Sequence, residues 1–171
     1  MMRVIEDLAA DWRRLDERVM GLSAETETGA HSDYGCERLM KVPGIGPVIS
    51  TAMVAAIGTG DGFSKGRDFA AWLGLVPRQM STGDRTILGK ISKCCNRYLR
   101  VLFVQAAFVV LIRLKSWERH GLKPWIEMAK RRLHRNVLAI ALANKLARIA
   151  RSVLARGRDF ELNTVPATQP A

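Results

Sequence analysis

A serine at the tip of a turn-rich segment is the residue of this sequence best suited to chemistry. Ser81, Thr82 and Gly83 lie in the middle of residues 76–90, and none of the three histidines of the chain falls in that stretch. A serine hydroxyl is a weak nucleophile unless a base or a metal ion activates it. Ser81 is therefore a candidate nucleophile that needs outside activation, whereas composition alone favours a helix-capping serine beside a solvated basic face.

Basic side chains cluster around this serine and predict a polyanionic partner. Two of them, Arg97 and Arg100, are one helical turn apart, so on a helix they can grip neighbouring phosphates. The candidate nucleic-acid contacts of this region are Arg78, Arg85, Lys90, Lys93, Arg97 and Arg100.

A second motif, in residues 39–58, places a proline-glycine turn between two apolar segments. A short helix is predicted to end at Lys41, and Pro47 suits the first turn of the next helix. Gly44, Ile45 and Gly46 form the turn, and the free N–H groups of a helix start bind phosphate oxygens well. The segment resembles a helix-hairpin-helix element and predicts phosphate binding, with a plain helix–helix connection as the alternative.

The charge of the chain is large and unevenly distributed. Its 171 residues carry a formal net charge of +11, made up of −3 in residues 1–77, +11 in residues 78–144 and +3 in residues 145–171. Such a chain usually binds nucleic acid, and an anionic membrane surface is the weaker alternative. The apolar run 101–112 is too short to cross a bilayer, so no membrane role is expected.

The cysteines indicate neither a disulfide framework nor a zinc site. Cys36, Cys94 and Cys95 are odd in number, and no pair has the spacing of zinc ligands. No residue set for a metal is therefore predicted within this chain. The pattern suits a reducing compartment, and the expected location is the bacterial cytoplasm, with association to the nucleoid.

The apolar periodicity predicts an all-α fold. Residues 1–22 carry apolar side chains at heptad spacing, which favours equally a helix packed on its own domain and a coiled coil that makes a homo-oligomer. Residues 23–35 are small and polar and predict a linker; residues 36–160 form the main domain, and 161–171 a disordered tail. Within that domain, helices are expected over about 93–115, 125–134 and 136–155, the last stopped by Gly157.

Four motifs in order resemble one family. They are VPGIGPVISTAMVAAIG, FAAWLGLVPRQ, STG and ISK followed by NRYLR, and ALANKLARIARSVLARG near the end also fits. The sequence from about Cys36 to Phe160 is similar to the C-terminal domain of insertion-sequence transposases of the IS110, IS116 and IS902 family.

The resemblance implies a specific chemistry. Members carry an N-terminal RuvC-like domain with acidic metal ligands, and a serine of the C-terminal domain completes a composite active site that attacks a DNA phosphate. Several members use a structured guide RNA, and a coiled coil usually joins the two domains. By this resemblance Ser81 is the nucleophile, DNA and a guide RNA are the partners, and Mg²⁺ is expected in the separate carboxylate domain.

Three departures from the family pattern affect this expectation. No carboxylate domain is visible in the sequence, so the chain alone is expected to be incomplete and inactive as a transposase. Cys94 and Cys95 stand where relatives usually have a basic residue and a glycine, and Asp84 where they often have glycine. A non-catalytic nucleic-acid-binding module therefore remains the alternative function.

Overall fold

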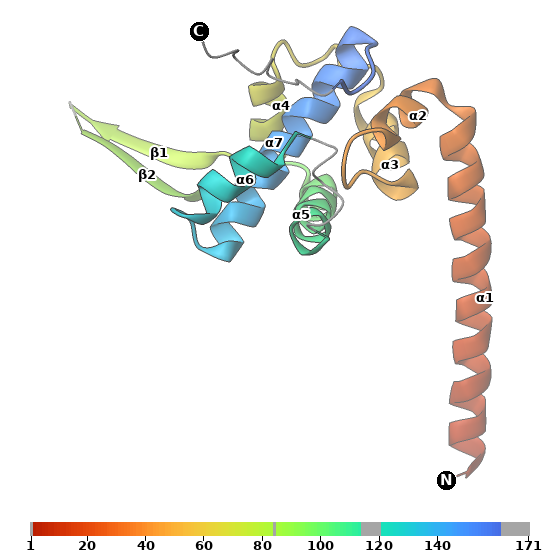
Figure 1. Cartoon of the computed structure of the whole chain (residues 1–171). Coiled ribbons are helices and arrows are strands. Elements are labelled where there is room, and N and C mark those ends of the chain that lie inside the picture. The colour runs from red at the N-terminus through yellow and green to blue at the C-terminus, as the bar shows by residue number, and fades with distance from the viewer. Residues whose placement is uncertain (1, 84, 114–120, 162–171) are drawn as a thin grey trace, which may run out of the picture.

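The computed structural model describes residues 2–83, 85–113 and 121–161, which form seven helices and one two-stranded sheet. Figure 1 shows a helical body from which a long helix, residues 2–32, and a two-stranded hairpin project. This hairpin, residues 77–82 and 85–91, is called the strand arm. The elements in chain order are α1 (Met2–Ser32), α2 (Tyr34–Met40), α3 (Pro47–Ile57), α4 (Gly66–Trp72), β1 (Pro77–Thr82), β2 (Arg85–Ile91), α5 (Arg97–Ile112), α6 (Lys123–Lys130) and α7 (Arg135–Arg156).

Helix α7 is the centre of the body and packs against α5, α4, α2 and α6. Small residues on its buried face let neighbouring helices come close, and leucines fill the space between them. Phe103 of α5 meets Phe69 of α4 edge to face, with ring centroids 6.2 Å apart. The buried residues of α7 are Leu138, Ala139, Leu142, Ala143, Leu146, Ala147, Ala150 and Val153.

Local sequence signals set the helix ends. Asp33 caps α2 by accepting a hydrogen bond from the Cys36 amide at 2.8 Å, and Asn96 caps α5 through the Leu99 amide at 2.9 Å. Gly157 ends α7 in the left-handed conformation, as its position predicts. The expected helices 125–134 and 136–155 are confirmed as α6 and α7 with shifted ends. Helix α5 begins at Arg97 rather than Lys93, and the expected end at 115 lies outside the described residues.

The all-α prediction is right for most of the chain but wrong for the turn-rich segment 76–90. That segment is an antiparallel hairpin in which Ser81 pairs with Thr86 and Thr82 with Arg85. Alternation of polar and apolar residues is the sequence signal of a half-buried strand. The strands β1 and β2 are exposed on both faces, so they carry no such alternation and the signal was missing.

The expected linker 23–35 is also helical over most of its length, because α1 continues to Ser32. Its small polar residues satisfy their hydroxyls within the helix. Thr26 donates to the Leu22 carbonyl at 2.7 Å and Thr28 to the Ala24 carbonyl at 2.9 Å. Only Asp33 interrupts the helix, before α2 begins.

Helix α1 extends away from the body and contacts it only near α2 and α3 (Figure 1). The large apolar side chains of residues 5–22 are exposed; Trp12, for example, has 70% of its surface accessible. The heptad stripe therefore does not pack on its own domain. No helix among the described residues is long and apolar enough to span a membrane.

Candidate nucleic-acid interface

The strand arm presents Ser81 to solvent close to its turn. Gly83, with φ of +59°, occupies a turn position that favours glycine. Ser81 and Gln79 lie on the same face of β1, and the Gln79 side-chain amide donates a hydrogen bond to the Ser81 Oγ at 2.9 Å. The amide orients the hydroxyl but cannot accept its proton. Sequence reasoning missed Gln79, because its proximity follows only from the strand conformation.

The strands of this arm carry positive charge only. Arg78, Arg85 and Lys90 are exposed, and neither β1 nor β2 contains an acidic residue. A β-bulge near Arg78 shifts the register between Pro77 and Gln79. Arg78 also donates to the Ser92 carbonyl at 3.3 Å. The arm therefore brings cations and a hydroxyl together on a surface open to a large ligand.

The remaining candidate cations lie at and beyond the base of the arm. Lys93 and Arg97 are exposed, whereas Arg100 is half-buried. Arg100 donates from one guanidinium nitrogen to the carbonyls of Leu73 and Cys94, each at 3.0 Å. This contact fixes the connection between α4 and α5, so part of the Arg100 guanidinium is engaged with the backbone. A phosphate contact by Arg97 or Arg100 stays a prediction.

Helices α2 and α3 flank the predicted proline-glycine turn. Gly44 has φ of +79°, and a β-carbon there would lie 2.6 Å from Val110 Cγ2 of α5. Ile45 is buried in the core. Gly46 precedes α3 and has open space around it. Packing against α5 therefore accounts for Gly44 and Ile45, Gly46 keeps an open approach, and phosphate binding by the three residues stays a prediction.

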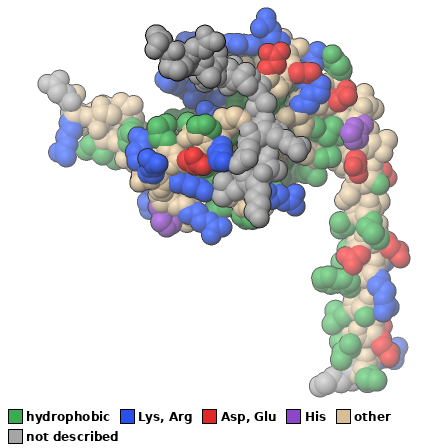
Figure 2. All heavy atoms as spheres, viewed as in Figure 1, with side chains coloured by type: hydrophobic (Ala, Val, Ile, Leu, Met, Phe, Trp, Pro, Cys, Tyr) green, Lys and Arg blue, Asp and Glu red, His purple; other side chains and the backbone are tan. Residues whose placement is uncertain are grey.

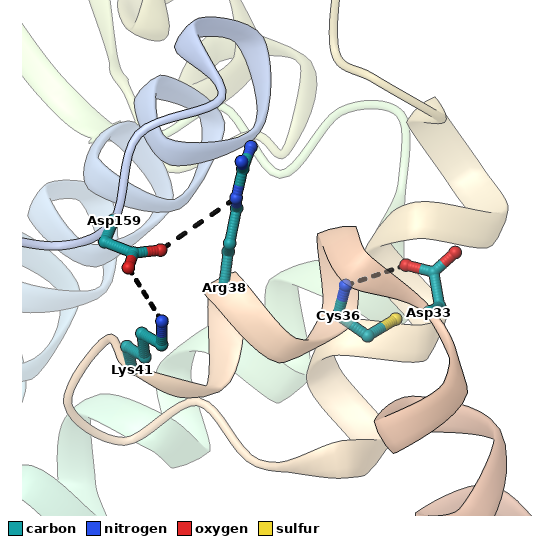
Figure 3. Close-up of polar contacts among 5 residues, drawn as sticks. All are labelled: Asp33, Cys36, Arg38, Lys41 and Asp159. Carbon is teal, nitrogen blue, oxygen red and sulfur yellow. Dashed lines mark hydrogen bonds and ion pairs between the residues drawn. The ribbon is translucent and has the colours of Figure 1, made fainter.

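An ion pair ties the start of this turn to the end of the described chain (Figure 3). Asp159 accepts a hydrogen bond from Lys41 Nζ at 2.7 Å, and its other oxygen lies 3.9 Å from Arg38 Nε. The hydrogen bond to Asp159 raises the pKa of Lys41. Lys41 is thereby neutralised locally, so it adds little positive field to the turn.

The thiols differ in their surroundings. Burial, together with the nearby Asp33 charge, raises the pKa of Cys36 to about 11. At the surface, a hydrogen bond from Cys95 lowers the pKa of Cys94, and the same contact raises that of Cys95. Cys95 has φ of +56°, a backbone conformation that favours glycine. This conformation gives a physical reason for the glycine expected at that position.

The part of the chain that the structure describes contains no group of three or more His, Cys, Asp or Glu side chains able to hold a metal ion. Asp84, the acid nearest to Ser81 in the sequence, lies outside the described residues. The described surroundings of Ser81 are an amide, hydroxyls and cations.

A family model matches about half of the chain, including the region that holds the candidate interface. Residues 36–122, which hold the proline-glycine turn, the strand arm and α5, match the model of the Transposase IS116/IS110/IS902 family. The chain belongs to this family. The resemblance drawn from the motifs is thus confirmed, and the match ends before α6 and α7.

Named relatives of this transposase family extend the similarity over most of the chain. A probable family 20 transposase of Pseudomonas aeruginosa is 38% identical over 156 residues, which cover 91% of this chain and 46% of the relative. The transposase of insertion sequence element IS1328 from Yersinia enterocolitica is 38% identical over 160 residues, 94% of this chain and 48% of the relative. The transposase of IS1111A from Coxiella burnetii is 32% identical, over 94% of this chain and 44% of the relative.

This chain therefore spans about half the length of the relatives that it matches.

Proposed function

We propose that this chain is the DNA-binding domain of an insertion-sequence transposase and acts in DNA transposition and recombination. The observation that carries the proposal is the exposed strand arm, which has cationic side chains, no acid on either strand, and Ser81 near its turn. Contacts from such side chains to phosphates position a protein on a duplex without reading its sequence. The transposase names of the relatives support DNA as the partner.

Ser81 is the nucleophile in this proposal. Its Oγ attacks a phosphodiester phosphorus, an Oγ–P bond forms, and one P–O bond to a sugar breaks. A carboxylate of the separate carboxylate domain, acting directly or through a water, would accept the hydroxyl proton and return it to the leaving sugar oxygen, which becomes a hydroxyl, so no net proton is gained or lost. The resulting serine phosphodiester keeps the energy of the broken bond. The hydroxyl of another strand end can then attack the same phosphorus, which breaks the Oγ–P bond and rejoins the DNA.

The described residues around Ser81 do not fit a Mg²⁺ site. The Oγ accepts from the Gln79 amide, and no cluster of metal-ligating side chains exists in the described ranges. The resemblance implies Mg²⁺ in a separate RuvC-like carboxylate domain, and the proposal assigns the metal ligands to that domain.

One observation favours a second candidate function, a non-catalytic nucleic-acid-binding module. The partner of the Ser81 hydroxyl is an amide, which can hold the hydroxyl in place but cannot activate it. In this alternative the arm and the α2–α3 turn bind nucleic acid, and Ser81 only adds a hydrogen bond to a phosphate.

The double variant Arg85→Gln/Lys90→Gln tests nucleic-acid binding by the arm. Both side chains are exposed, so their loss should leave the fold intact. The logarithm of the binding constant for a duplex DNA decreases with the logarithm of the salt concentration. If each side chain contacts one phosphate, the variant makes the magnitude of this slope smaller by about 1.8. Fluorescence anisotropy with a labelled duplex at several salt concentrations measures this slope.

The matched control is Arg13→Gln/Arg14→Gln, which removes the same charge from exposed positions of α1. Its slope should equal that of the unmodified chain. Equal slopes for all three proteins would show that the arm does not contact the nucleic acid.

A guide RNA is a proposed second partner of this chain.

We also propose that α1 makes a homo-oligomer through its heptad stripe. The large stripe residues are exposed on residues 5–22, the part of the projecting helix that lies farther from the body (Figure 2). A coiled coil buries such a stripe against a second copy. The stripe residues are Ile5, Leu8, Trp12, Leu15, Val19 and Leu22.

Leu8→Glu/Leu15→Glu should convert the resulting oligomer to a monomer, because it places charges in the centre of the stripe. Ala10→Glu/Ala24→Glu adds the same charges at exposed positions off the stripe and should leave the oligomer intact. Sedimentation equilibrium measures the mass of each protein. A monomeric unmodified chain at all concentrations would contradict the coiled coil.

A further inference from the structure

A cationic cavity lies where the start of α4 meets the second half of α7. It has a volume of about 420 Å³, and no acidic side chain is among its lining residues. Lysines and arginines dominate the lining, which places several positive charges around one concave surface. The cationic residues of the lining are Lys65, Lys145, Arg148, Arg151 and Arg156.

These five cations have no carboxylate partner within hydrogen-bonded or ion-pair distance among the described residues. Arg151 donates to the Phe63 carbonyl, and its Nε is buried with no hydrogen-bond partner in the described part of the chain. Lys145 Nζ lies 5.1 Å from the centroid of the Trp125 ring. The Nε is closed to a ligand, but the cations that line the cavity have no carboxylate partner among the described residues, and this charge calls for an anionic ligand.

Asp68, an acid bonded to residues of the lining, is already engaged. Asp68 accepts hydrogen bonds from the Ser64 hydroxyl at 2.7 Å and the Lys65 amide at 2.9 Å. These two bonds, helped by the charges of Lys65 and then Arg151, lower the pKa of Asp68. The carboxylate offsets part of the positive charge but does not line the cavity.

Helix α7 holds these cations on a rigid support. It has 22 residues, none of them acidic, and its opposite face is buried in the core. At 1.5 Å per residue, the stretch from Lys145 to Arg156 rises by about 16 Å. This stretch is therefore long enough to lie beside more than one phosphate of a strand.

The same helix also reaches the base of the strand arm. A second cavity, of about 680 Å³, lies between the arm region and α7; its lining is mostly apolar and also includes Lys90, Lys93 and Asn144. Residues 137–144 of α7 thus line the cavity at the base of the arm, and residues 145–156 line the cationic cavity.

We propose that the cationic cavity between α4 and α7, the α4–α7 cavity, is a second binding site for the phosphodiester backbone of a nucleic acid. Arg148, Arg151 and Arg156 are its main contacts. The proposal rests on the proposed function, since it assumes a nucleic-acid partner. DNA and RNA share the phosphodiester chemistry, so the cavity takes either one. It lies apart from Ser81 and serves to hold the strand.

The test uses the full 171-residue chain and the double variant Arg148→Gln/Arg156→Gln. Both side chains are exposed, so the variant should fold, and a thermal unfolding measurement is the check of this. Two labelled probes of equal length, a duplex DNA and a hairpin RNA, report the source of the backbone. For the bound probe, the salt slope should fall by about 1.8, because two phosphate contacts are lost. Arg148→Lys/Arg156→Lys keeps the charge and should keep the slope.

Two further variants separate this inference from the proposed function. Arg13→Gln/Arg14→Gln removes two charges from α1 and should leave the slope unchanged, whereas Arg85→Gln/Lys90→Gln reports on the arm. A slope that falls for the arm variant alone overturns the cavity and leaves the proposed function standing. Slopes unchanged for both the arm and the cavity variants overturn both. A fall for the cavity variant with either probe supports the inference and identifies the nucleic acid.

Discussion

Ser81→Ala is expected to abolish DNA strand transfer while DNA binding stays the same. The experiment combines the 171-residue chain with the carboxylate domain of a full-length relative and follows recombination of a plasmid substrate. The substitution removes only the Oγ, and Ser81 lies exposed on the arm, so no packing is lost. Loss of a nucleophile typically costs several orders of magnitude in rate.

Thr82→Ala is the matched control, because it removes the neighbouring hydroxyl of the same strand. It should retain strand transfer. Recombination that persists in Ser81→Ala would remove the nucleophile assignment and leave the non-catalytic module as the better account. Loss in Thr82→Ala with retention in Ser81→Ala would move the assignment by one residue.

Gly44→Ala is expected to lower the free energy of unfolding by about 2–4 kcal/mol, from a left-handed backbone and an overpacked contact. The new β-carbon would lie 2.6 Å from Val110 Cγ2 and 3.1 Å from the Ala106 carbonyl oxygen. The oxygen belongs to the α5 backbone and cannot rotate away. Urea unfolding monitored by circular dichroism measures the change.

Gly46→Ala is the control for this prediction, because its β-carbon would meet no atom within 4 Å and the Gly46 φ is −110°. Its unfolding free energy should change by less than about 0.5 kcal/mol. Equal destabilisation of the two variants would mean that the turn does not pack on α5 as described. If the turn binds phosphate, Gly46→Ala should weaken DNA binding while the free energy of unfolding stays the same.

Sequence patterns predicted the parts of the fold that have strong local signals. The ends of α7 follow from its apolar periodicity and from Gly157, and α3 begins at Pro47 as expected. The strand arm was missed because its two exposed strands need no alternating pattern. The continuation of α1 was missed because its threonines satisfy their hydroxyls within the helix rather than breaking it.

The candidate site was only partly predictable. Ser81 and the arm cations follow from residue types along the sequence, but their common exposure on a two-stranded arm depends on strand pairing. Arg100 was selected for its charge, and its bond to the Leu73 carbonyl depends on how α4 and α5 meet. The α4–α7 cavity combines Lys65 with Arg148, which are far apart in sequence, so spacing gave no signal for it.

Mapping the covalent protein–DNA bond tests the central claim most directly. The chain, supplied with a carboxylate domain, is incubated with a nicked DNA substrate that traps the intermediate, and the digested adduct is sequenced by mass spectrometry. The account predicts a nucleotide on the peptide that contains Ser81, attached at that serine. An adduct on a different residue, or strand transfer with no protein–DNA adduct, would contradict it.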